Sequence, residues 1–239
     1  MISIVIPVYK SASTLVELHR RLSDISAAEN WKCEVIYVND ASPDYSLNVL
    51  ETLTHSIDFQ IINLKNNVGQ SSALLVGMLF AKHDLIATMD ADLQDEPEKL
   101  PELVRSLKQS TDVIFAKRKG SYESGGRLFT SFLFKGLVHV FSGQRIPMNA
   151  GLFMVIRKKA ALLLLPFLPQ SPYLIGLIAN AKLTCDSIVI DRRENQFGES
   201  SYTFKKRLVV AKRFFGTLKL RPTISLSEVT EWVNLNLLA

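Results

Sequence analysis

Short apolar runs alternate with segments of helical periodicity along the first half of the chain. Four runs have the length and apolar character of buried strands, at residues 2–8, 34–38, 60–64 and 85–89. Three segments between them repeat apolar residues at helical spacing, at residues 14–28, 45–53 and 70–82. This alternation predicts an α/β fold with a mostly parallel sheet, right-handed crossovers and flanking helices.

The second half of the chain changes character. A helix is predicted over residues 97–109, because Pro97 would lie in its first turn and Glu96 and Glu98 near its positive end. Further strands are expected at residues 112–116, 151–156 and 187–190, and residues 128–141 are apolar on several faces. Since no linker or repeat interrupts the chain, residues 1–225 are predicted to form one domain, with an internal boundary near residue 100.

Residues 226–239 are predicted to form a helical tail. Ser227 is its expected cap, and Val229, Trp232, Val233 and Leu237 would share one face. That apolar face would dock on its own domain, on a partner chain or on lipid. The sequence is compatible with a monomer or an oligomer.

The composition is that of a globular protein with a sizeable core, since 47% of the 239 residues are hydrophobic and 21% are charged. Cys33 and Cys185 lie far apart with no histidine at ligand spacing. This pattern argues against a disulfide framework or a zinc site and suits a reducing compartment. A strand that starts at residue 2 indicates no signal peptide, and no apolar run is long enough to span a membrane. We therefore expect a cytoplasmic protein.

The net charge of +5 is unevenly distributed. Between Glu199 and Glu228 the chain has no acid but seven basic residues: Lys205, Lys206, Arg207, Lys212, Arg213, Lys219 and Arg221. Apolar residues such as Val209 and Phe214 interleave with them. This pattern is typical of a helix that binds a membrane surface, and equally of an ordinary helix with solvated lysines. Nucleic acid is not an expected partner, because no groove-reading or stacking motif accompanies the charge.

An acidic stretch follows the strand predicted at residues 85–89. Asp90 and Asp92 are two residues apart and Gln94 follows, so that three oxygen-bearing side chains lie on one side of an extended turn. Oxygen ligands of this kind suit Mg²⁺ or Mn²⁺, which complete their coordination shell with substrate phosphates. The alternative is a solvated acidic turn that caps the next helix, because short motifs of this kind often occur by chance.

Three other predicted strands also end in polar residues. Pro7 and Tyr9 end the first, and Tyr9 could stack on a base. Asp40 follows the second and could accept a hydrogen bond from a base N–H. Residues 66–70 open a helix after the third, where backbone N–H groups favour anions. Each motif alone is compatible with turn and cap chemistry, but the predicted topology brings all of them to one sheet edge, where α/β proteins bind ligands.

These motifs resemble the ordered signatures of GT-A glycosyltransferases of family 2. They are Pro7-Val8-Tyr9, Asn39-Asp40-Ala41-Ser42, Asn67-Val68-Gly69-Gln70 and Asp90-Ala91-Asp92-Leu93-Gln94. The continuation of the last motif through Asp95, Pro97 and Glu98 resembles the polyprenyl-phosphate branch, which includes dolichol-phosphate mannose synthase and bactoprenol glucosyltransferases. The resemblance extends through residues 115–118, 151–158 and 198–202, and so covers the chain from about residue 2 to residue 215.

The resemblance implies a role for each residue at the sheet edge. Asp40 would read the nucleobase in a slot shaped by Pro7 and Tyr9. Asp90 would hold the ribose or the metal-bound diphosphate, and Asp92 and Gln94 would ligate Mg²⁺ or Mn²⁺. Residues 1–100 would then form the nucleotide-sugar half and residues 101–225 the acceptor half.

Cationic and polar residues in the second half would hold phosphates. Arg118 and Arg127 lie where the family places cations near the donor or acceptor, and a guanidinium fork suits phosphate. Arg193 and Ser200 are further candidates for the acceptor phosphate. Asp92 and Arg118 are the expected catalytic residues. Gly125 and Gly126 would give mobility to a lid over the donor.

The chain departs from the family pattern in three places. Asn195 stands where the lipid-phosphate branch commonly has an arginine, although Arg192 or Arg193 could substitute for it. Asn149 and Leu152 stand where relatives often carry acids, so no carboxylate is available there as a base. An anionic acceptor needs no strong general base, whereas a sugar hydroxyl usually does. Relatives also frequently end in membrane-spanning helices, which this sequence does not contain.

The resemblance implies an inverting, metal-dependent transfer of a sugar from a UDP- or GDP-linked donor to polyprenyl phosphate, in cell-envelope glycan assembly. The protein would work in the cytoplasm or as a peripheral protein on the inner face of the cytoplasmic membrane. One alternative is transfer to a sugar hydroxyl of a polysaccharide or lipid-linked glycan. Another is a non-catalytic, nucleotide-binding scaffold, but the intact Asp90 and Asp92 argue against it, because a scaffold needs no metal site.

Overall fold

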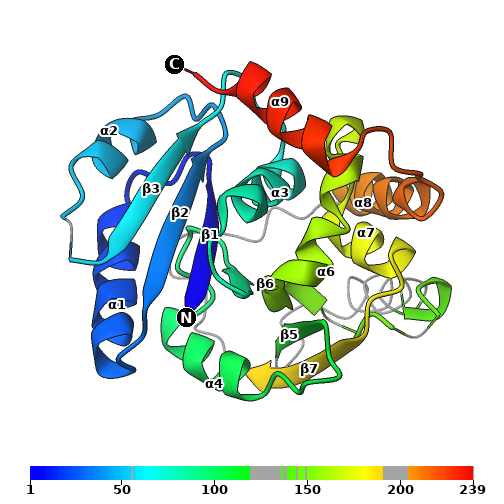
Figure 1. Ribbon diagram of the computed structural model, residues 1–239, viewed down its shortest axis with the longest axis horizontal. Coiled ribbons are helices and arrows are strands. Elements are labelled where there is room, and N and C mark those ends of the chain that lie inside the picture. Colours follow the sequence, from blue (N-terminus) through cyan, green and yellow to red (C-terminus); the bar gives the residue numbers. More distant parts are fainter. Residues whose placement is uncertain are drawn as a thin grey trace.

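A seven-stranded sheet with the strand order β3-β2-β1-β4-β6-β5-β7 organises the molecule (Figure 1). The computed structural model describes residues 1–54, 56–118, 136, 139–143, 145–148, 150–190 and 204–238, with backbone alone at residues 118 and 204–208. The sheet is mostly parallel and helices flank it, which confirms the predicted α/β class.

The first half of the chain forms the parallel part of the sheet. Its strands are β1 (Ile2–Val8), β2 (Cys33–Asn39), β3 (Asp58–Asn63) and β4 (Leu85–Thr88). The helices between them are α1 (Leu15–Ala28), α2 (Ser46–Glu51) and α3 (Gln70–Phe80). β1 pairs in parallel with β2 and β4, and β2 pairs in parallel with β3. The carboxyl ends of these strands therefore share one edge, as the alternating pattern predicted.

The second half adds strands of both directions. Its strands are β5 (Val113–Arg118), β6 (Ala150–Arg157) and β7 (Cys185–Ile190). β6 lies antiparallel between β4 and β5, and β7 pairs in parallel with β5. The helical elements are η1 (Pro97–Lys99), α4 (Leu100–Arg105), α6 (Lys158–Leu162), η2 (Leu165–Gln170), α7 (Leu174–Asn180), α8 (Phe204–Thr217) and α9 (Leu226–Asn236).

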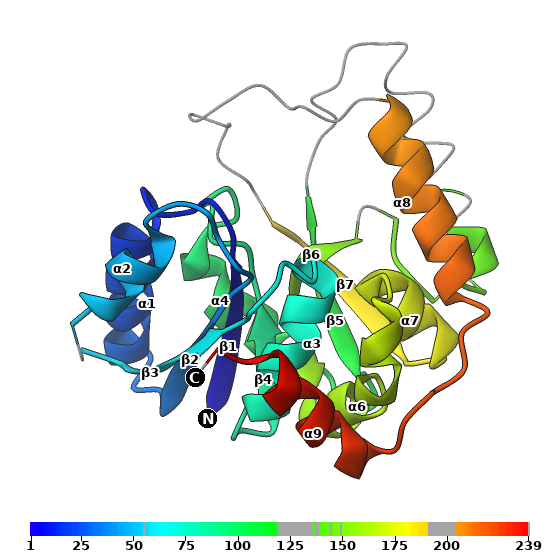
Figure 2. The ribbon, with the colours of Figure 1, turned by 90° about the horizontal axis from the view of Figure 1, so that it is seen from above.

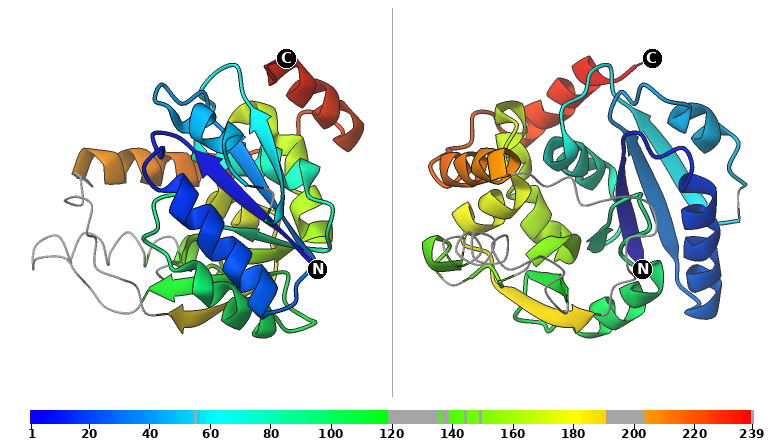
Figure 3. Two further views of the ribbon diagram at one scale, coloured as in Figure 1. Left: turned by 90° about the vertical axis from the view of Figure 1, so that its left-hand side faces the viewer. Right: turned by 180° about the vertical axis from the view of Figure 1, so that it is seen from behind.

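Alternate residues of each strand point into one of two apolar layers. In β1, Val5 belongs to the layer formed with α3, α6, α7 and α9, whereas Ile4 and Ile6 belong to the layer formed with α1, α2 and α4. Figures 2 and 3 show these helix groups on opposite faces of the sheet. In the first layer α3 lies so close to β1 that a methyl group at Gly77 would stand 2.2 Å from Cγ1 of Val5.

The tail helix α9 packs on its own domain. Val229 and Val233 are fully buried in the α3 layer, and Trp232 and Leu237 pack against it. The predicted cap was wrong: the N-cap is Ser225, whose Oγ accepts from the N–H of Glu228. Glu228 lies three residues after Ser225 and its carboxylate accepts from the Ser225 N–H, so that these two residues complete a capping box.

Within the described part of the chain, no helix has both the length and the apolar content needed to cross a membrane. The boundary near residue 100 and the separate status of the tail stay predictions.

Candidate active site

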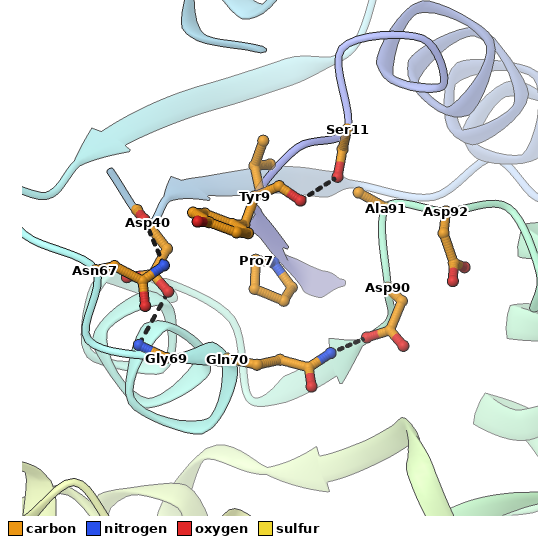
Figure 4. A pocket seen from close by; sticks show the side chains of 11 residues that line it. Pro7, Tyr9, Ser11, Asp40, Asn67, Gly69, Gln70, Asp90, Ala91 and Asp92 are labelled. Carbon is orange, nitrogen blue, oxygen red and sulfur yellow. Dashed lines mark hydrogen bonds between the residues drawn. The ribbon is translucent and has the colours of Figure 1, made fainter. Parts of the chain in front are cut away.

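A pocket of about 390 Å³ lies at the carboxyl edge of β1, β2 and β4 (Figure 4). It is lined by Pro7, Val8, Tyr9, Ser11, Asp40, Asn67, Gly69, Gln70, Asp90, Ala91 and Asp92. Pro7, Tyr9, Asp40, Asp90 and Asp92, which were singled out from the sequence, therefore share one pocket.

Asp40 fixes the backbone of the loop that leads into α3. Its side chain is buried, and its two carboxylate oxygens accept from the N–H groups of Val68 at 2.6 Å and Gly69 at 3.0 Å. Nδ2 of Asn67 donates to the main-chain oxygen of Asp40 at 3.0 Å. Burial raises the pKa of the Asp40 carboxyl, and the two N–H donors oppose that rise. Asp40 thus holds the loop that forms one wall of the pocket, and it is itself one of the lining residues.

Asp90 and Asp92 form the acidic side of the pocket. Nε2 of Gln70 donates to Oδ1 of Asp90 at 2.6 Å, and this bond joins the first turn of α3 to the chain after β4. Asp92 is exposed, and its Oδ1 accepts from the backbone N–H of Gln94 at 3.0 Å. Among the described residues, the lining includes both aspartates but not Gln94. The role of Gln94 as a metal ligand stays a prediction.

Three left-handed residues turn the chain beside this pocket. Lys10, Ala41 and Leu93 have φ angles of 55°, 49° and 57°. They directly follow Tyr9, Asp40 and Asp92, which line the pocket. Non-glycine residues seldom adopt this conformation, and such backbone strain clusters at functional sites. None of the three positions is glycine or asparagine, so the residue types gave no signal of these turns.

Tyr9 is the aromatic group of the pocket. Its side chain is 45% exposed, which leaves ring surface available to a flat ligand. The Nζ atom of Lys10 lies 5.6 Å from the centre of the ring, a cation–π distance. Tyr9 and Asp40 line the same pocket, so that an aromatic ring and a carboxylate-bearing residue lie together there.

Residues 3–163 match the family model described as glycosyl transferase family 2. The chain belongs to glycosyl transferase family 2. It is a glycosyltransferase, and the family resemblance inferred from the sequence motifs is confirmed.

Relatives of known sequence are also glycosyltransferases. The chain is 29% identical over 226 residues to the uncharacterised glycosyltransferase YkcC of Bacillus subtilis, which covers 92% of this chain and 69% of the relative. It is 29% identical over 232 residues to the undecaprenyl-phosphate 4-deoxy-4-formamido-L-arabinose transferase of Proteus mirabilis, which covers 95% of this chain and 71% of the relative. The chain thus spans a little over two thirds of each relative's length.

The fold agrees with solved glycosyltransferase structures. One is glucosyl-3-phosphoglycerate synthase from Mycobacterium tuberculosis in complex with Mn²⁺, UDP and phosphoglyceric acid, with a TM-score of 0.66 and 15% identity. The match covers 93% of this chain and 80% of that structure. It confirms the predicted GT-A fold.

The residues predicted from the sequence to contact the acceptor are described only in part. Arg118 ends β5 and pairs with Ile190 of β7, but its side chain is not described. Arg127, Arg193 and Ser200 lie outside the described residues, as do Gly125 and Gly126. Their roles stay predictions.

The start of β6 lies beside the acidic turn of the pocket. Oγ1 of Thr88, the last residue of β4, donates to the carbonyl oxygen of Leu152 at 2.5 Å. Leu152 therefore lies at the carboxyl end of β4, from which the chain leads to Asp90, and Ala150 starts β6, the strand to which Leu152 belongs. Both are apolar, so these described positions supply no carboxylate to the acidic turn.

Sequence reasoning did not assign individual side-chain roles to the polar lining residues Ser11, Asn67 and Gln70. Asn67 and Gln70 belong to one of the quoted motifs, which was a usable signal. Ser11 lacked any signal of its own, because its place in the pocket follows from the left-handed turn at Lys10.

Proposed function

We propose that this glycosyltransferase transfers a sugar, with inversion, from a nucleotide-sugar donor to polyprenyl phosphate. The observation that carries the proposal is the joint placement of Tyr9, Asp40, Asp90 and Asp92 around one pocket. An aromatic ring and a carboxylate can recognise a base, and two further carboxylates can organise a diphosphate through a cation.

The residues present fit a divalent cation that is shared with a substrate. Asp90 and Asp92 offer hard oxygen atoms to the pocket, and no group of three or more His, Cys, Asp or Glu side chains forms a metal site in the described residues. Mg²⁺ and Mn²⁺ suit such a site, because they take few protein ligands and bind substrate phosphates. Asp92, with Gln94, would hold the ion. When bound, it would stabilise the charge on the diphosphate leaving group.

The protein itself would orient the donor. Asp40 fixes the loop of Asn67 and Gly69 and, with Tyr9 and Pro7, would hold the base. Gln70 holds Oδ1 of Asp90 in place. Asp90 would hold the ribose or the diphosphate. Inversion requires the acceptor to attack from the face of the sugar opposite the diphosphate.

Two observations support an anionic lipid acceptor. The relative from Proteus mirabilis is named for transfer involving undecaprenyl phosphate. Leu152 offers no general base at the carboxyl end of β4, Asn149 lies outside the described residues, and a phosphate acceptor does not need a strong base. Arg118, Arg127, Arg193 and Ser200 are the proposed phosphate contacts. Asn195 favours the second candidate, transfer to a sugar hydroxyl of a glycan.

The described part of α8 supports a peripheral position on the inner face of the membrane. Val209 is 58% exposed, and Lys212 and Arg213 are exposed on the same helix. Phe141 is 58% exposed and its ring contacts Phe215 of α8 edge-on, with centres 5.1 Å apart. Exposed apolar side chains next to basic ones match the interfacial region of an anionic bilayer.

Calorimetric titration with UDP, GDP and their sugars, with and without Mn²⁺, tests the donor site. We expect Mn²⁺-dependent binding of one nucleotide, and we expect Asp92→Ala to abolish it without loss of the fold. Asp58→Ala removes an exposed acid at the other end of the sheet and is the control. Normal turnover by Asp92→Ala would overturn the proposed mechanism. Assays with polyprenyl phosphate and with glycan acceptors then decide between the two candidate reactions.

A further inference from the structure

The end of α9 hydrogen-bonds to the chain that leads from β3 toward the pocket. The N–H of Leu238 donates to the Asn63 carbonyl at 2.8 Å, and the N–H of Lys65 donates to the Asn236 carbonyl at 2.9 Å. Leu64 and Leu237 form an antiparallel bridge between these two bonds. Segment 236–238 thus lies beside residues 63–65, joined to them by an isolated antiparallel β-bridge and two backbone hydrogen bonds (Figure 1).

The core anchors this segment. Val229 and Val233 of α9 are fully buried in the same apolar layer as Leu64, and Leu237 packs against that layer. Nδ2 of Asn236 donates to the carbonyl of Trp232 at 2.8 Å, which ties the segment to the last turn of the helix. The position of segment 236–238 is therefore set by the packing of α9.

Residues 64–69 connect this contact directly to the pocket. At one end, Leu64 and Lys65 are held by segment 236–238. At the other, the N–H groups of Val68 and Gly69 are held by Asp40. Gly69 lies within the pocket lining, together with its neighbour Asn67. Only three residues separate Lys65 from Gly69, so the two contacts lie within one short segment.

A second connection between Asn63 and the pocket runs through side-chain hydrogen bonds. Oδ1 of Asn63 accepts from Nδ2 of Asn39 at 2.7 Å, and Oδ1 of Asn39 accepts from the N–H of Ser42 at 3.3 Å. Oγ of Ser42 then accepts from the N–H of Lys10 at 2.7 Å. Asn63, which receives the Leu238 N–H, is therefore linked to the left-handed turn that follows Tyr9.

We propose that segment 236–238 positions the nucleotide site, and that the N–H of Leu238 is its main contact. The segment would hold residues 64–69 and, through Asn63 and Asn39, the turns after β1 and β2. This inference rests on the proposed donor site at the pocket. Leu238 is a positioning residue in this scheme, since it would act through the loop and would not touch the nucleotide.

Leu238→Pro removes the N–H and puts its ring Cδ in the place of the hydrogen that faces the Asn63 carbonyl, so the variant breaks this contact. Leu237 already has φ −83° and ψ 143°, the extended conformation that a following proline requires. The Leu238 side chain is 50% exposed, so little packing is lost. Leu238→Ala is the matched control, because it shortens the same side chain and keeps the N–H.

The first experiment is amide hydrogen exchange on the full chain without nucleotide. The net loss of one hydrogen bond corresponds to a factor of about five in the local opening equilibrium. We expect the Val68 and Gly69 amides to exchange about fivefold faster in Leu238→Pro and at the original rate in Leu238→Ala. Equal rates in all three proteins would overturn the inference.

The second experiment is calorimetric titration of the three proteins with UDP and GDP in the presence of Mn²⁺. We expect Leu238→Pro to raise the Kd about fivefold at unchanged stoichiometry. A lower stoichiometry with unchanged Kd would mean partial unfolding alone and would contradict a positioning role. If the original chain bound neither nucleotide, the proposed donor site would fail, while the exchange rates would still decide whether segment 236–238 holds the loop.

Discussion

Gln70 donates from Nε2 to Oδ1 of Asp90 across 2.6 Å, although the two residues are twenty positions apart in the sequence. Gln70 opens α3, which begins after the loop held by Asp40, and Asp90 follows β4. The bond therefore couples the wall of the pocket that Asp40 shapes to its acidic side. The bond also occupies one oxygen of Asp90 and orients its carboxylate.

Replacement of Gln70 by leucine should weaken nucleotide binding. Gln70→Leu keeps the approximate size of the side chain and removes the donor to Asp90. Because a hydrogen bond to a charged group contributes about 1.5–3 kcal/mol, we expect the Mn²⁺-dependent Kd to rise tenfold or more. Calorimetry measures the change. Asn48→Ala, at an exposed position of α2 outside the pocket lining, is the control. An unchanged Kd in Gln70→Leu would show that Asp90 needs no orienting partner.

Asp44 should make the protein sensitive to acid. Burial opposes its ionisation, but hydrogen bonds from Ser42, Ser46 and Ala12 lower its pKa from the usual 3.8 to about 2. The unfolded chain therefore binds a proton at higher pH than the folded one. The stabilisation is fully present above a pH of about 4 and is lost as the pH falls toward 2.

Urea unfolding at several pH values between 2 and 5 measures this effect. The difference in free energy of unfolding between the original protein and Asp44→Asn should shrink as the pH falls through this window. Glu51→Gln, which removes an exposed acid of α2, controls for the general loss of one carboxylate. A difference that stays constant with pH would contradict the lowered pKa of Asp44.

Two glycines should respond in opposite directions to substitution by alanine. A Cβ at Gly77 would stand 2.2 Å from Cγ1 of the fully buried Val5, so α3 or β1 must shift. Overpacking of this kind costs about 1–3 kcal/mol. A Cβ at Gly216 of α8 would meet no atom within 4 Å. There, alanine should add up to about 1 kcal/mol through its helix propensity.

Thermal unfolding of Gly77→Ala and Gly216→Ala checks both expectations with the same chemical change. We expect a lower Tm for Gly77→Ala and an equal or higher Tm for Gly216→Ala. A Tm for Gly77→Ala as high as that of the original protein would mean that α3 does not need this close approach to β1.

The sequence pattern predicted the parallel half of the sheet and the residues at its carboxyl edge. This succeeded because strand length, helical periodicity and crossover handedness are local or general constraints. Pro7, Tyr9, Asp40, Asp90 and Asp92 lie in one pocket for that reason. The position of β6 between β4 and β5 depends on contacts between distant segments, and the pattern did not predict it.

The predictions of two local features were wrong. The helix predicted over residues 97–109 is divided into η1 and the short α4, which ends at Arg105. Pro101 has no N–H to donate to the carbonyl of Pro97, so a continuous α-helix cannot form there. At α9, both Ser225 and Ser227 are good caps. The position of Glu228 decides for Ser225, because a capping box needs the acid three residues after the cap.

Substitutions that remove positive charge from α8 should weaken binding to anionic vesicles. Lys212 and Arg213 are exposed beside Val209, and each basic residue near such a surface contributes about 1 kcal/mol. We expect Lys212→Gln combined with Arg213→Gln to reduce vesicle affinity about tenfold or more at low salt. The difference should fall as salt rises, because the Debye length is only about 10 Å at 0.1 M.

Lys32→Gln combined with Lys159→Gln makes the same change in net charge at exposed sites on other elements and is the control. Equal losses in the two double variants would mean that net charge alone attracts the protein to the vesicle. No loss in either would remove the membrane-surface proposal for α8.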